Sequence, residues 1–212
     1  MPRVSRVSCP ITALGPGRRM VVWFQGCPLA CTGCLARDTW SPSGGSDLAL
    51  PTLERMWREA LEHGMDGLTV SGGEPLAQPD ELAELLEMAA AARDEMGREA
   101  DLLVYTGYEP DEVDMAPLRR ADAVITGRYD AARPTRLIWR GSANQVLTPR
   151  TELGHARYDR HLDHEPERPP MQFSVDGANV WFAGVPARGA MARLERALRA
   201  RGVTFEGVTW RP

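Results

Sequence analysis

The stretch MVVWFQG at residues 20–26 runs straight into CPLACTGC at residues 27–34. Its first part is a short apolar run, rich in β-branched and aromatic side chains, which predicts a buried strand. Its second part holds three of the chain's four cysteines. We therefore expect these cysteines on a loop at the carboxyl end of a strand, where α/β sheets build their sites.

The next hundred residues predict alternating strands and helices. Strands are expected in GLTVSGGEP, DLLVYTGY and ADAVITGRY (residues 67–75, 101–108 and 121–129), and VSRVSCPIT (residues 4–12) is expected as an edge strand. Helices are expected over residues 52–63, 79–96 and 111–120. Thr52 is the expected N-cap of the first helix, and Gly64 and Gly97 are the expected stops of the first two. This order is typical of parallel strands with helices packed outside.

The alternation of predicted strands and helices ends after about residue 128. IWRGSANQVL (residues 138–147) predicts a loop that leads into a short strand, and the polar, proline-rich residues 150–170 predict a surface excursion. MQFSVDGANVWFAG (residues 171–184) predicts a β-hairpin that turns at Asp176 and Gly177. An amphipathic helix over residues 188–201 and a last strand in VTFEGVTW (residues 203–210) complete the expectation. The chain is thus expected to be α/β, with a core at residues 1–150 and a C-terminal extension at residues 151–212 that packs on it.

Composition narrows the possible functions. All 25 basic residues are arginine, so Schiff-base chemistry through lysine is excluded. A net charge of −4 gives no reason to expect non-specific attraction to nucleic acid or to an anionic membrane. The first residues lack the apolar run of a signal peptide, and no stretch reaches the roughly 18 apolar residues of a membrane span. We expect a cytoplasmic protein whose thiols stay reduced, so the clustered cysteines indicate metal or redox chemistry.

Three thiolates on one loop suit two kinds of metal site. Structural zinc needs four ligands, and the fourth would come from Cys9 or from one of the histidines (His63, His155, His161 and His164). A [4Fe–4S] cluster normally takes four thiolates, so three would leave one iron open to bind a ligand. The three histidines within residues 150–170 do not have the spacing that would place them together on one face of a helix as metal ligands. Cys9 is expected to be an ordinary buried or edge thiol.

The spacing Cys-x3-Cys-x2-Cys after the first central strand resembles that of the radical S-adenosylmethionine (radical SAM) enzymes. SGGEP at residues 71–75 lies where that superfamily has its GGE motif. FQGCPLACTGCLARDTW resembles the opening loop of the anaerobic ribonucleotide reductase activating proteins, with Gly33 before the third cysteine and Thr39 followed by Trp40. YTGY, DAVITGRY and RGSANQ match further segments of that branch in order, so the resemblance covers about residues 5–150.

The resemblance implies a fold, two cofactors and a set of site residues. The fold would be a partial (β/α) barrel with parallel strands, followed by the hairpin and the helix. Cys27, Cys31 and Cys34 would hold three irons of a [4Fe–4S] cluster, and S-adenosylmethionine would chelate the fourth iron. Reductive cleavage would give a 5′-deoxyadenosyl radical that removes a hydrogen atom from the substrate. The cofactor-binding residues would be Gly33 and Leu35 near the adenine, Gly72, Gly73 and Glu74 at the methionine end, and Thr106, Gly107 and Tyr105 closing the same pocket.

Ser142, Asn144 and Gln145 have two interpretations, as contacts to ribose or substrate or as a polar loop that satisfies its own backbone. The chain departs from the branch where Leu35 and Ala36 stand in place of a common Tyr-Asn pair, and its tail is longer. In that tail, Trp181 and Phe182 are expected in the hairpin core. Arginines on the last helix (Arg193, Arg196 and Arg199) predict a solvated face or a docking surface.

Three functional hypotheses follow. The first is an activating enzyme that generates a glycyl radical on a partner such as anaerobic ribonucleotide reductase, reduced by a donor such as flavodoxin or ferredoxin. The second is a small radical SAM enzyme that modifies a peptide, a nucleotide or another metabolite. The third is a non-catalytic zinc or iron–sulfur module. Cleavage of S-adenosylmethionine on reduction separates the first two from the third.

Overall fold

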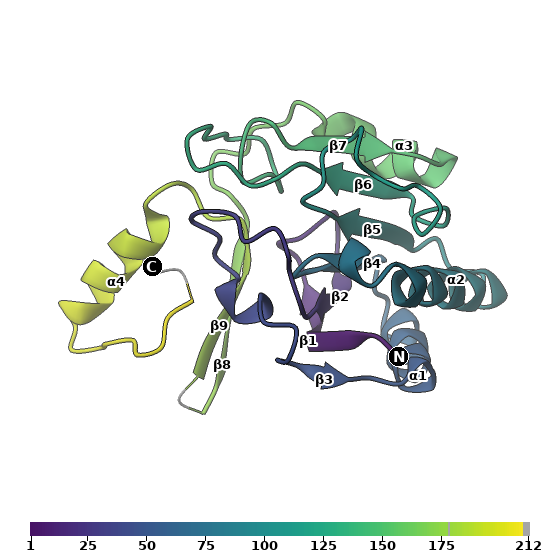
Figure 1. Ribbon diagram of the computed structural model, residues 1–212, viewed down its shortest axis with the longest axis horizontal. Coiled ribbons are helices and arrows are strands. Elements are labelled where there is room, and N and C mark those ends of the chain that lie inside the picture. The colour runs from purple at the N-terminus through teal and green to yellow at the C-terminus, as the bar shows by residue number, and fades with distance from the viewer. Residues whose placement is uncertain (178, 210–212) are drawn as a thin grey trace.

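A seven-stranded mixed sheet forms the centre of the computed structural model, which describes residues 1–177 and 179–209 (Figure 1). Its strand order is β3-β1-β2-β4-β5-β6-β7, and β8 and β9 form a separate pair. The strands are β1 (Arg3–Ile11), β2 (Arg19–Phe24), β3 (Ser46–Asp47), β4 (Gly67–Gly72), β5 (Asp101–Tyr105), β6 (Ala123–Thr126), β7 (Val146–Pro149), β8 (Met171–Asp176) and β9 (Asn179–Gly184). The α-helices are α1 (Leu50–Glu62), α2 (Pro79–Glu95), α3 (Glu152–Tyr158) and α4 (Ala190–Arg199).

The parallel arrangement that the sequence predicts holds for the four central strands. β2, β4, β5 and β6 are parallel neighbours, whereas β1, β3 and β7 are antiparallel to the strands beside them. β1 lies between β2 and the two-residue β3, which pairs only with Arg3 and Val4, so most of β1 is an edge. The register brings Phe24 opposite Gly72, which places the exits of β2 and β4 side by side.

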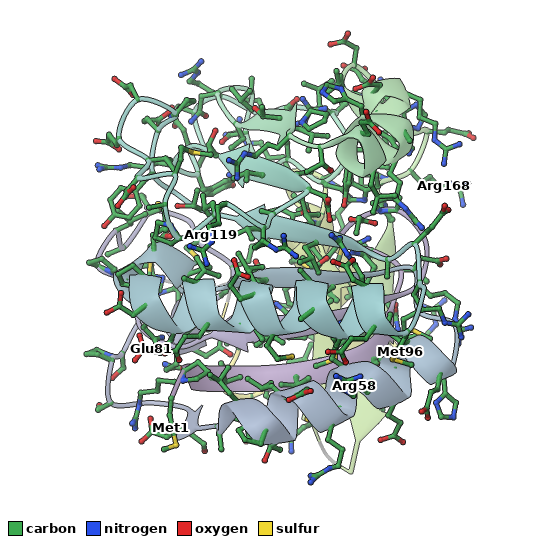
Figure 2. The ribbon with its side chains drawn as sticks, turned by 90° about the vertical axis from the view of Figure 1, so that its right-hand side faces the viewer. Met1, Arg58, Glu81, Met96, Arg119 and Arg168 are labelled. Carbon is green, nitrogen blue, oxygen red and sulfur yellow. The ribbon has the colours of Figure 1, made fainter. Side chains whose placement is uncertain are left out.

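Helices α1 and α2 cover one face of the sheet (Figure 2). Leu53, Trp57 and Leu61 of α1 have no exposed surface, so they form the face of this helix that packs on the sheet. The indole Nε1 of Trp57 donates to the carbonyl oxygen of Ala89 in α2 at 3.0 Å, so the two helices are joined by a bond as well as by packing. Gly64 and Gly97 follow the helices with positive φ, as helix stops do.

The other face of the sheet is covered by the later part of the chain. Tyr158 of α3 and Trp139 pack on Leu103 and Ile125, in a cluster separate from the helical one. Ala183 of β9 packs with residues from β1, β2 and the turn between them (Ile11, Val21 and Leu14). The C-terminal hairpin, whose strands pair out to Asp176 and Asn179, therefore contributes to the core of the sheet.

A buried ion pair joins the amino ends of three parallel strands. The guanidinium of Arg19 in β2 pairs with the carboxylate of Asp101 in β5 at 2.8 Å, and neither side chain has exposed surface. Its Nε donates to Thr69 Oγ1 of β4 at 2.6 Å, and the Tyr158 hydroxyl of α3 also contacts Asp101. Burial alone would lower the pKa of Arg19, but the nearby Tyr158 and Asp101 outweigh it and raise that pKa.

Several sequence expectations are wrong. Residues 111–120 form turns and no helix, because Asp114 accepts from the amide of Ala116 at 2.9 Å and Pro117 has no N–H to donate. Helix α1 begins at Leu50, with Ala49 as its N-cap and Pro51 in the first turn, so Thr52 lies inside the helix.

The C-terminal region differs from expectation at two further places. Residues 150–170 contain α3 and are no mere surface excursion, because the fully buried Tyr158 anchors them to the sheet. Residues 203–209 form no strand, and the rest of that predicted strand, Trp210, lies outside the described residues. Among the helices that the structure describes, none has the length and apolar character needed to cross a bilayer.

The Arg19 ion pair predicts unequal effects of two conservative substitutions. Asp101→Asn leaves a buried guanidinium without its counter-charge and is expected to cost about 3–5 kcal/mol of unfolding free energy. Tyr158→Phe removes only one hydrogen bond and is expected to cost about 1–2 kcal/mol. Urea unfolding measures both. Glu54→Gln, which breaks an exposed ion pair with Arg58, is the control and should cost under about 1 kcal/mol of unfolding free energy. An equally small cost for Asp101→Asn would contradict the role of the buried ion pair.

Candidate functional site

The cysteine loop leaves the carboxyl end of β2 and returns to it through backbone hydrogen bonds. The amide of Gly26 donates to the Thr39 carbonyl at 2.8 Å, and the amide of Cys27 donates to the Trp40 carbonyl at 3.0 Å. The buried side-chain amide of Gln25 donates to the carbonyls of Asp38 and Ser41 at 3.0 and 2.7 Å. The Thr39-Trp40 pair thus closes the loop through its main chain. The Gln25 side chain holds the returning segment in place, a role that the sequence did not indicate.

Cys27, Cys31 and Cys34 are partly buried on this loop, and none of them is in a disulfide. Burial raises the pKa of the Cys27 thiol and of the Cys31 thiol, and each of these thiols interacts electrostatically with another cysteine of the loop. Within residues 1–177 and 179–209, no three His, Cys, Asp or Glu side chains surround a common point as a metal cage would. The donor set itself, three free thiols on one short loop, fits an iron–sulfur cluster.

The glycine turn at the end of β4 packs directly against the start of the cysteine loop. The amide of Gly73 donates to the Phe24 carbonyl at 2.8 Å, and the amide of Glu74 donates to the Gly26 carbonyl at 2.9 Å. A Cβ on Gly73 would lie 2.2 Å from the Gly26 oxygen, and Gly72 has a φ of +109°. Both glycines are therefore required by the close approach of two backbone segments. The resemblance to the radical SAM enzymes implies a further role for both glycines, at the methionine end of S-adenosylmethionine.

The carboxylate of Glu74 joins the ends of β4 and β5. It is 1% exposed and accepts from three donors, namely the Leu76 amide (2.9 Å), the Thr106 hydroxyl (2.8 Å) and the Gly107 amide (2.7 Å). Burial raises the pKa of Glu74, and the three hydrogen bonds oppose that shift. The structure thus brings Glu74, Thr106 and Gly107 together as the sequence predicts, but with the carboxylate oxygens already engaged by the protein.

Gly107 also touches the cysteine loop. A Cβ added to it would lie 2.5 Å from Cδ1 of Leu29, which stands between Cys27 and Cys31 in the sequence. The ends of β2, β4 and β5 therefore meet around Leu29 and Glu74. The hydroxyl oxygen of Tyr105, at the end of β5, is buried and has no hydrogen-bond partner in the described part of the chain, and the charged groups that act on it are Arg19 and Arg140. Burial raises the pKa of this phenol.

Gly33 and Leu35 lie on another side of the loop from the glycine turn. Gly33 has a φ of +81°, and a Cβ on it would lie 3.4 Å from the Tyr129 ring. The Leu35 carbonyl accepts from the Thr209 hydroxyl at 2.7 Å, so the segment after α4 is bonded to the cysteine loop. The backbone of Tyr129 also acts to lower the pKa of the Cys31 thiol, against the larger effect of burial, which raises it. The structure thus places these two predicted residues between residues 129–131 and the C-terminal segment.

The predicted polar residues 142–145 satisfy their own backbone. Ser142 has no exposed surface and accepts from the Asp130 amide at 3.1 Å. Asn144 donates to the Arg128 carbonyl at 2.7 Å, and Gln145 donates to the Gly127 carbonyl at 3.0 Å while accepting from the Gly141 amide. Of the two interpretations of these residues, the structure favours the self-satisfied loop, which shapes the chain after β6.

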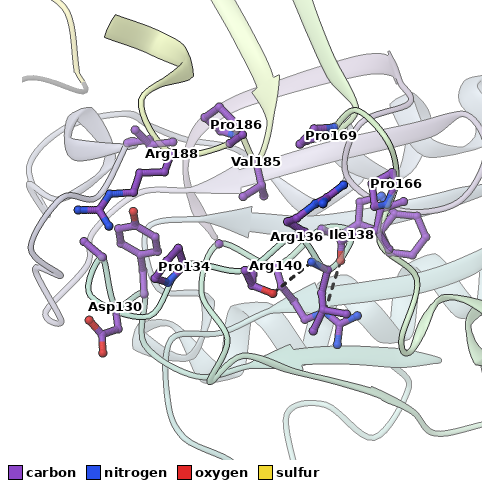
Figure 3. Close-up of a pocket in the computed structure, with 18 residues that line it drawn as sticks. Asp130, Pro134, Arg136, Ile138, Arg140, Pro166, Pro169, Val185, Pro186 and Arg188 are labelled. Carbon is purple, nitrogen blue, oxygen red and sulfur yellow. Dashed lines mark hydrogen bonds between the residues drawn. The ribbon is translucent and has the colours of Figure 1, made fainter.

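A small hollow lies beside Leu35, between residues 129–141 and 166–188 (Figure 3). It encloses about 60 Å³, and Arg136, Arg140 and Arg188 are among the residues that line it. Arg140 is mostly buried, and burial lowers its pKa; it donates to the carbonyls of His161 and Leu162. One wall of the hollow thus comes from the loop after β6 and the other from the C-terminal region.

Comparison with known proteins defines the class of this site. Residues 13–148 match the family described as "4Fe-4S single cluster domain". The anaerobic ribonucleoside-triphosphate reductase-activating protein of Enterobacteria phage T4 is 32% identical over 141 residues, which are 65% of this chain and 88% of the phage protein. The protein of the same description from Pasteurella multocida is 37% identical over 146 residues, 63% and 88% of the two chains. The crystal structure of QueE from Escherichia coli has a TM-score of 0.42 at 16% identity, covering 59% of this chain and 69% of that one.

The matched region contains the cysteine loop, the glycine turn and the ends of the parallel strands. The chain belongs to the 4Fe-4S single cluster domain family and, within it, to the anaerobic ribonucleoside-triphosphate reductase-activating proteins.

The contact between Gly73 and Gly26 predicts that a single methyl group disturbs the cysteine loop. Gly73→Ala is expected to lower the unfolding free energy by about 1–3 kcal/mol and to speed labelling of the loop thiols by a thiol-reactive reagent. Gly97→Ala is the matched control, because a Cβ there meets nothing within 4 Å and only its φ of +60° is unfavourable. Equal labelling rates in both variants would contradict the packing argument.

The Glu74 carboxylate predicts coupling between two substitutions. Glu74→Gln is expected to cost about 1–3 kcal/mol, because an amide cannot accept from all three donors, and Thr106→Val is expected to cost about 0.5–1.5 kcal/mol. The double variant should cost less than the sum by at least about 0.5 kcal/mol, since the two side chains share a bond. Urea unfolding of the four proteins measures this, and strict additivity would count against the bond.

Proposed function

We propose that Cys27, Cys31 and Cys34 bind three irons of the [4Fe–4S] cluster and that the strand ends beside them bind S-adenosylmethionine. The observation that supports this most is the direct bonding of the Gly73-Glu74 turn to the start of the cysteine loop, through the Phe24 and Gly26 carbonyls. Cluster and nucleoside would then meet at one edge of the sheet. When bound, they supply reductive cleavage of a sulfonium bond and hydrogen-atom abstraction.

The chain's own residues would position and shield this chemistry. Gly26 and Gly73 keep the loop close to β4, and Gln25 fixes the returning segment. Because the Glu74 carboxylate is fully bonded within the protein, we assign it the role of fixing Thr106 and Gly107. The amides of Gly73 and Glu74 and the Glu74 carbonyl are already bonded within the protein, so the Gly73 carbonyl is the group of this turn that would accept from the ammonium of S-adenosylmethionine.

The substrate that the family supports is a glycine of a partner enzyme, the anaerobic ribonucleoside-triphosphate reductase, on which the chain generates a radical. A donor such as flavodoxin or ferredoxin would supply the electron in the cytoplasm. We also propose that residues 1–150 form the radical SAM core, as a partial (β/α) barrel, and that residues 151–212 form an extension packed on it. The extension and the Leu35-Ala36 pair favour one alternative, that the same chemistry acts on a peptide or a metabolite.

The chain offers its own control for the cluster assignment. Each of Cys27→Ala, Cys31→Ala and Cys34→Ala is expected to lose most of the roughly four irons per chain that anaerobic reconstitution gives a [4Fe–4S] protein. Cys9→Ala, on the exposed edge of β1, should retain them. Iron analysis and the cluster's visible absorption measure both. Full iron binding after loss of any loop cysteine would remove that residue from the ligand set.

A second experiment tests the substrate. The reconstituted protein, S-adenosylmethionine and a reductant are incubated with the anaerobic reductase from the same genome, and the glycyl radical is detected by electron paramagnetic resonance. We expect 5′-deoxyadenosine and the radical together. Formation of 5′-deoxyadenosine without a radical on the reductase would favour the peptide or metabolite alternative, and stoichiometric zinc without cleavage would end both.

A further inference from the structure

Positive charge is concentrated in one short part of the C-terminal region. Residues 188–201 contain five arginines and one glutamate, a net charge of +4, whereas the whole chain carries −4. The rest of the chain therefore carries −8. Such segregation gives one surface a potential opposite to that of the remaining molecule, and it steers partners of opposite charge.

The arginines form an exposed stripe on α4. Arg193, Arg196 and Arg199 recur at intervals of three, which places them on one side of the helix, and all three are exposed. In the described part of the chain, neither Arg196 nor Arg199 takes part in an ion pair. Arg188, just before the helix, extends the stripe toward its first turn. We name Arg188, Arg193, Arg196 and Arg199 the arginine face.

The arginine face is next to the cysteine loop. Arg188 and Leu35 line the same hollow, and Leu35 follows Cys34 directly. On the far side of α4, the segment that follows it returns to the loop, where Thr209 bonds to the Leu35 carbonyl. Figure 1 shows α4 on the side of the molecule where this loop lies. A partner held by the arginine face would therefore lie beside the loop on which the cluster is proposed.

The helix is built for a protein partner and not for a lipid surface. A membrane-binding amphipathic helix buries its apolar side in the bilayer. Here that side is turned to the protein, because Met191 is 7% exposed and Leu194 and Leu198 are partly buried. The exposed residues of α4 are three arginines and two alanines, Ala192 and Ala197. A charged face with little exposed apolar area suits a small, short-lived, electrostatically steered contact, which is how electron-transfer partners meet.

We propose that the arginine face docks the acidic protein that donates the electron. This rests on the proposed function, because only a reductive reaction needs such a donor. One electron would leave the reduced donor, which is oxidised by one electron, and the [4Fe–4S] cluster proposed on the cysteine loop would be reduced by it. No covalent bond of the arginine face forms or breaks. The role of the arginines is to bring the donor's acidic surface to the edge of the loop.

The test compares two double variants with the same change in charge. Arg196→Glu/Arg199→Glu reverses the arginine face, and Arg55→Glu/Arg119→Glu reverses two exposed arginines near α1 and α2 (Arg119 is labelled in Figure 2). Binding of an acidic flavodoxin to the reconstituted protein is measured by calorimetry at low and high salt. We expect the first variant to weaken binding at least about tenfold at low ionic strength and the control less than about threefold. For the unchanged protein, affinity should fall as salt rises.

A second readout separates this proposal from the proposed function. With flavodoxin as the donor, the face variant should cleave S-adenosylmethionine more slowly than the control; with dithionite, a small reductant that needs no docking, the two should be equal. Loss of cleavage with both reductants in the unchanged protein would refute the proposed function instead. Three results would overturn the docking proposal: salt-independent binding, equal weakening by both double variants, or an effect of the face variant only on anionic vesicles or on binding of the reductase.

Discussion

The guanidinium of Arg19 is the group on which the arrangement of the sheet depends. It lies fully buried at the amino ends of the parallel strands and binds Asp101 of β5 and Thr69 of β4. A buried cation of this kind is tolerated only when its partners are in place, so the register of three strands and the position of Tyr158 are fixed together. The opposite ends of the same strands are thereby set at defined positions, and these ends form the proposed cofactor site.

The carboxyl ends of the strands use a second buried charge in a different way. Glu74 binds two backbone amides and one hydroxyl, and the glycine turn beside it lies against the main chain of Phe24 and Gly26. Most of these contacts are made by backbone atoms. The thiols of the cysteine loop are therefore not needed to hold the strand ends together, which suits the cluster-binding role proposed for them.

Sequence patterns predicted the parts of this molecule that depend on local periodicity or on short motifs. The central strands, the helices α1 and α2, and the approach of residues 72–74 to the cysteine loop all followed from them. The patterns failed in two ways, through local turn contacts within residues 111–120 and through contacts between residues far apart in the sequence. The aspartates and the proline of residues 111–120 form turns, and a single tyrosine, Tyr158, makes a polar segment part of the core. The buried pairing of Arg19 with Asp101 had no signal either, because the partners are 82 residues apart.

The hollow beside Leu35 has walls of different origin. Residues 129–141 belong to the region shared with the family, whereas residues 166–188 lie beyond the residues 13–148 that match it. Substitutions in the second wall can change what approaches the cysteine loop without altering the inherited chemistry. The shape of this hollow can therefore vary with the sequence of residues 166–188 while the residues that match the family stay unchanged.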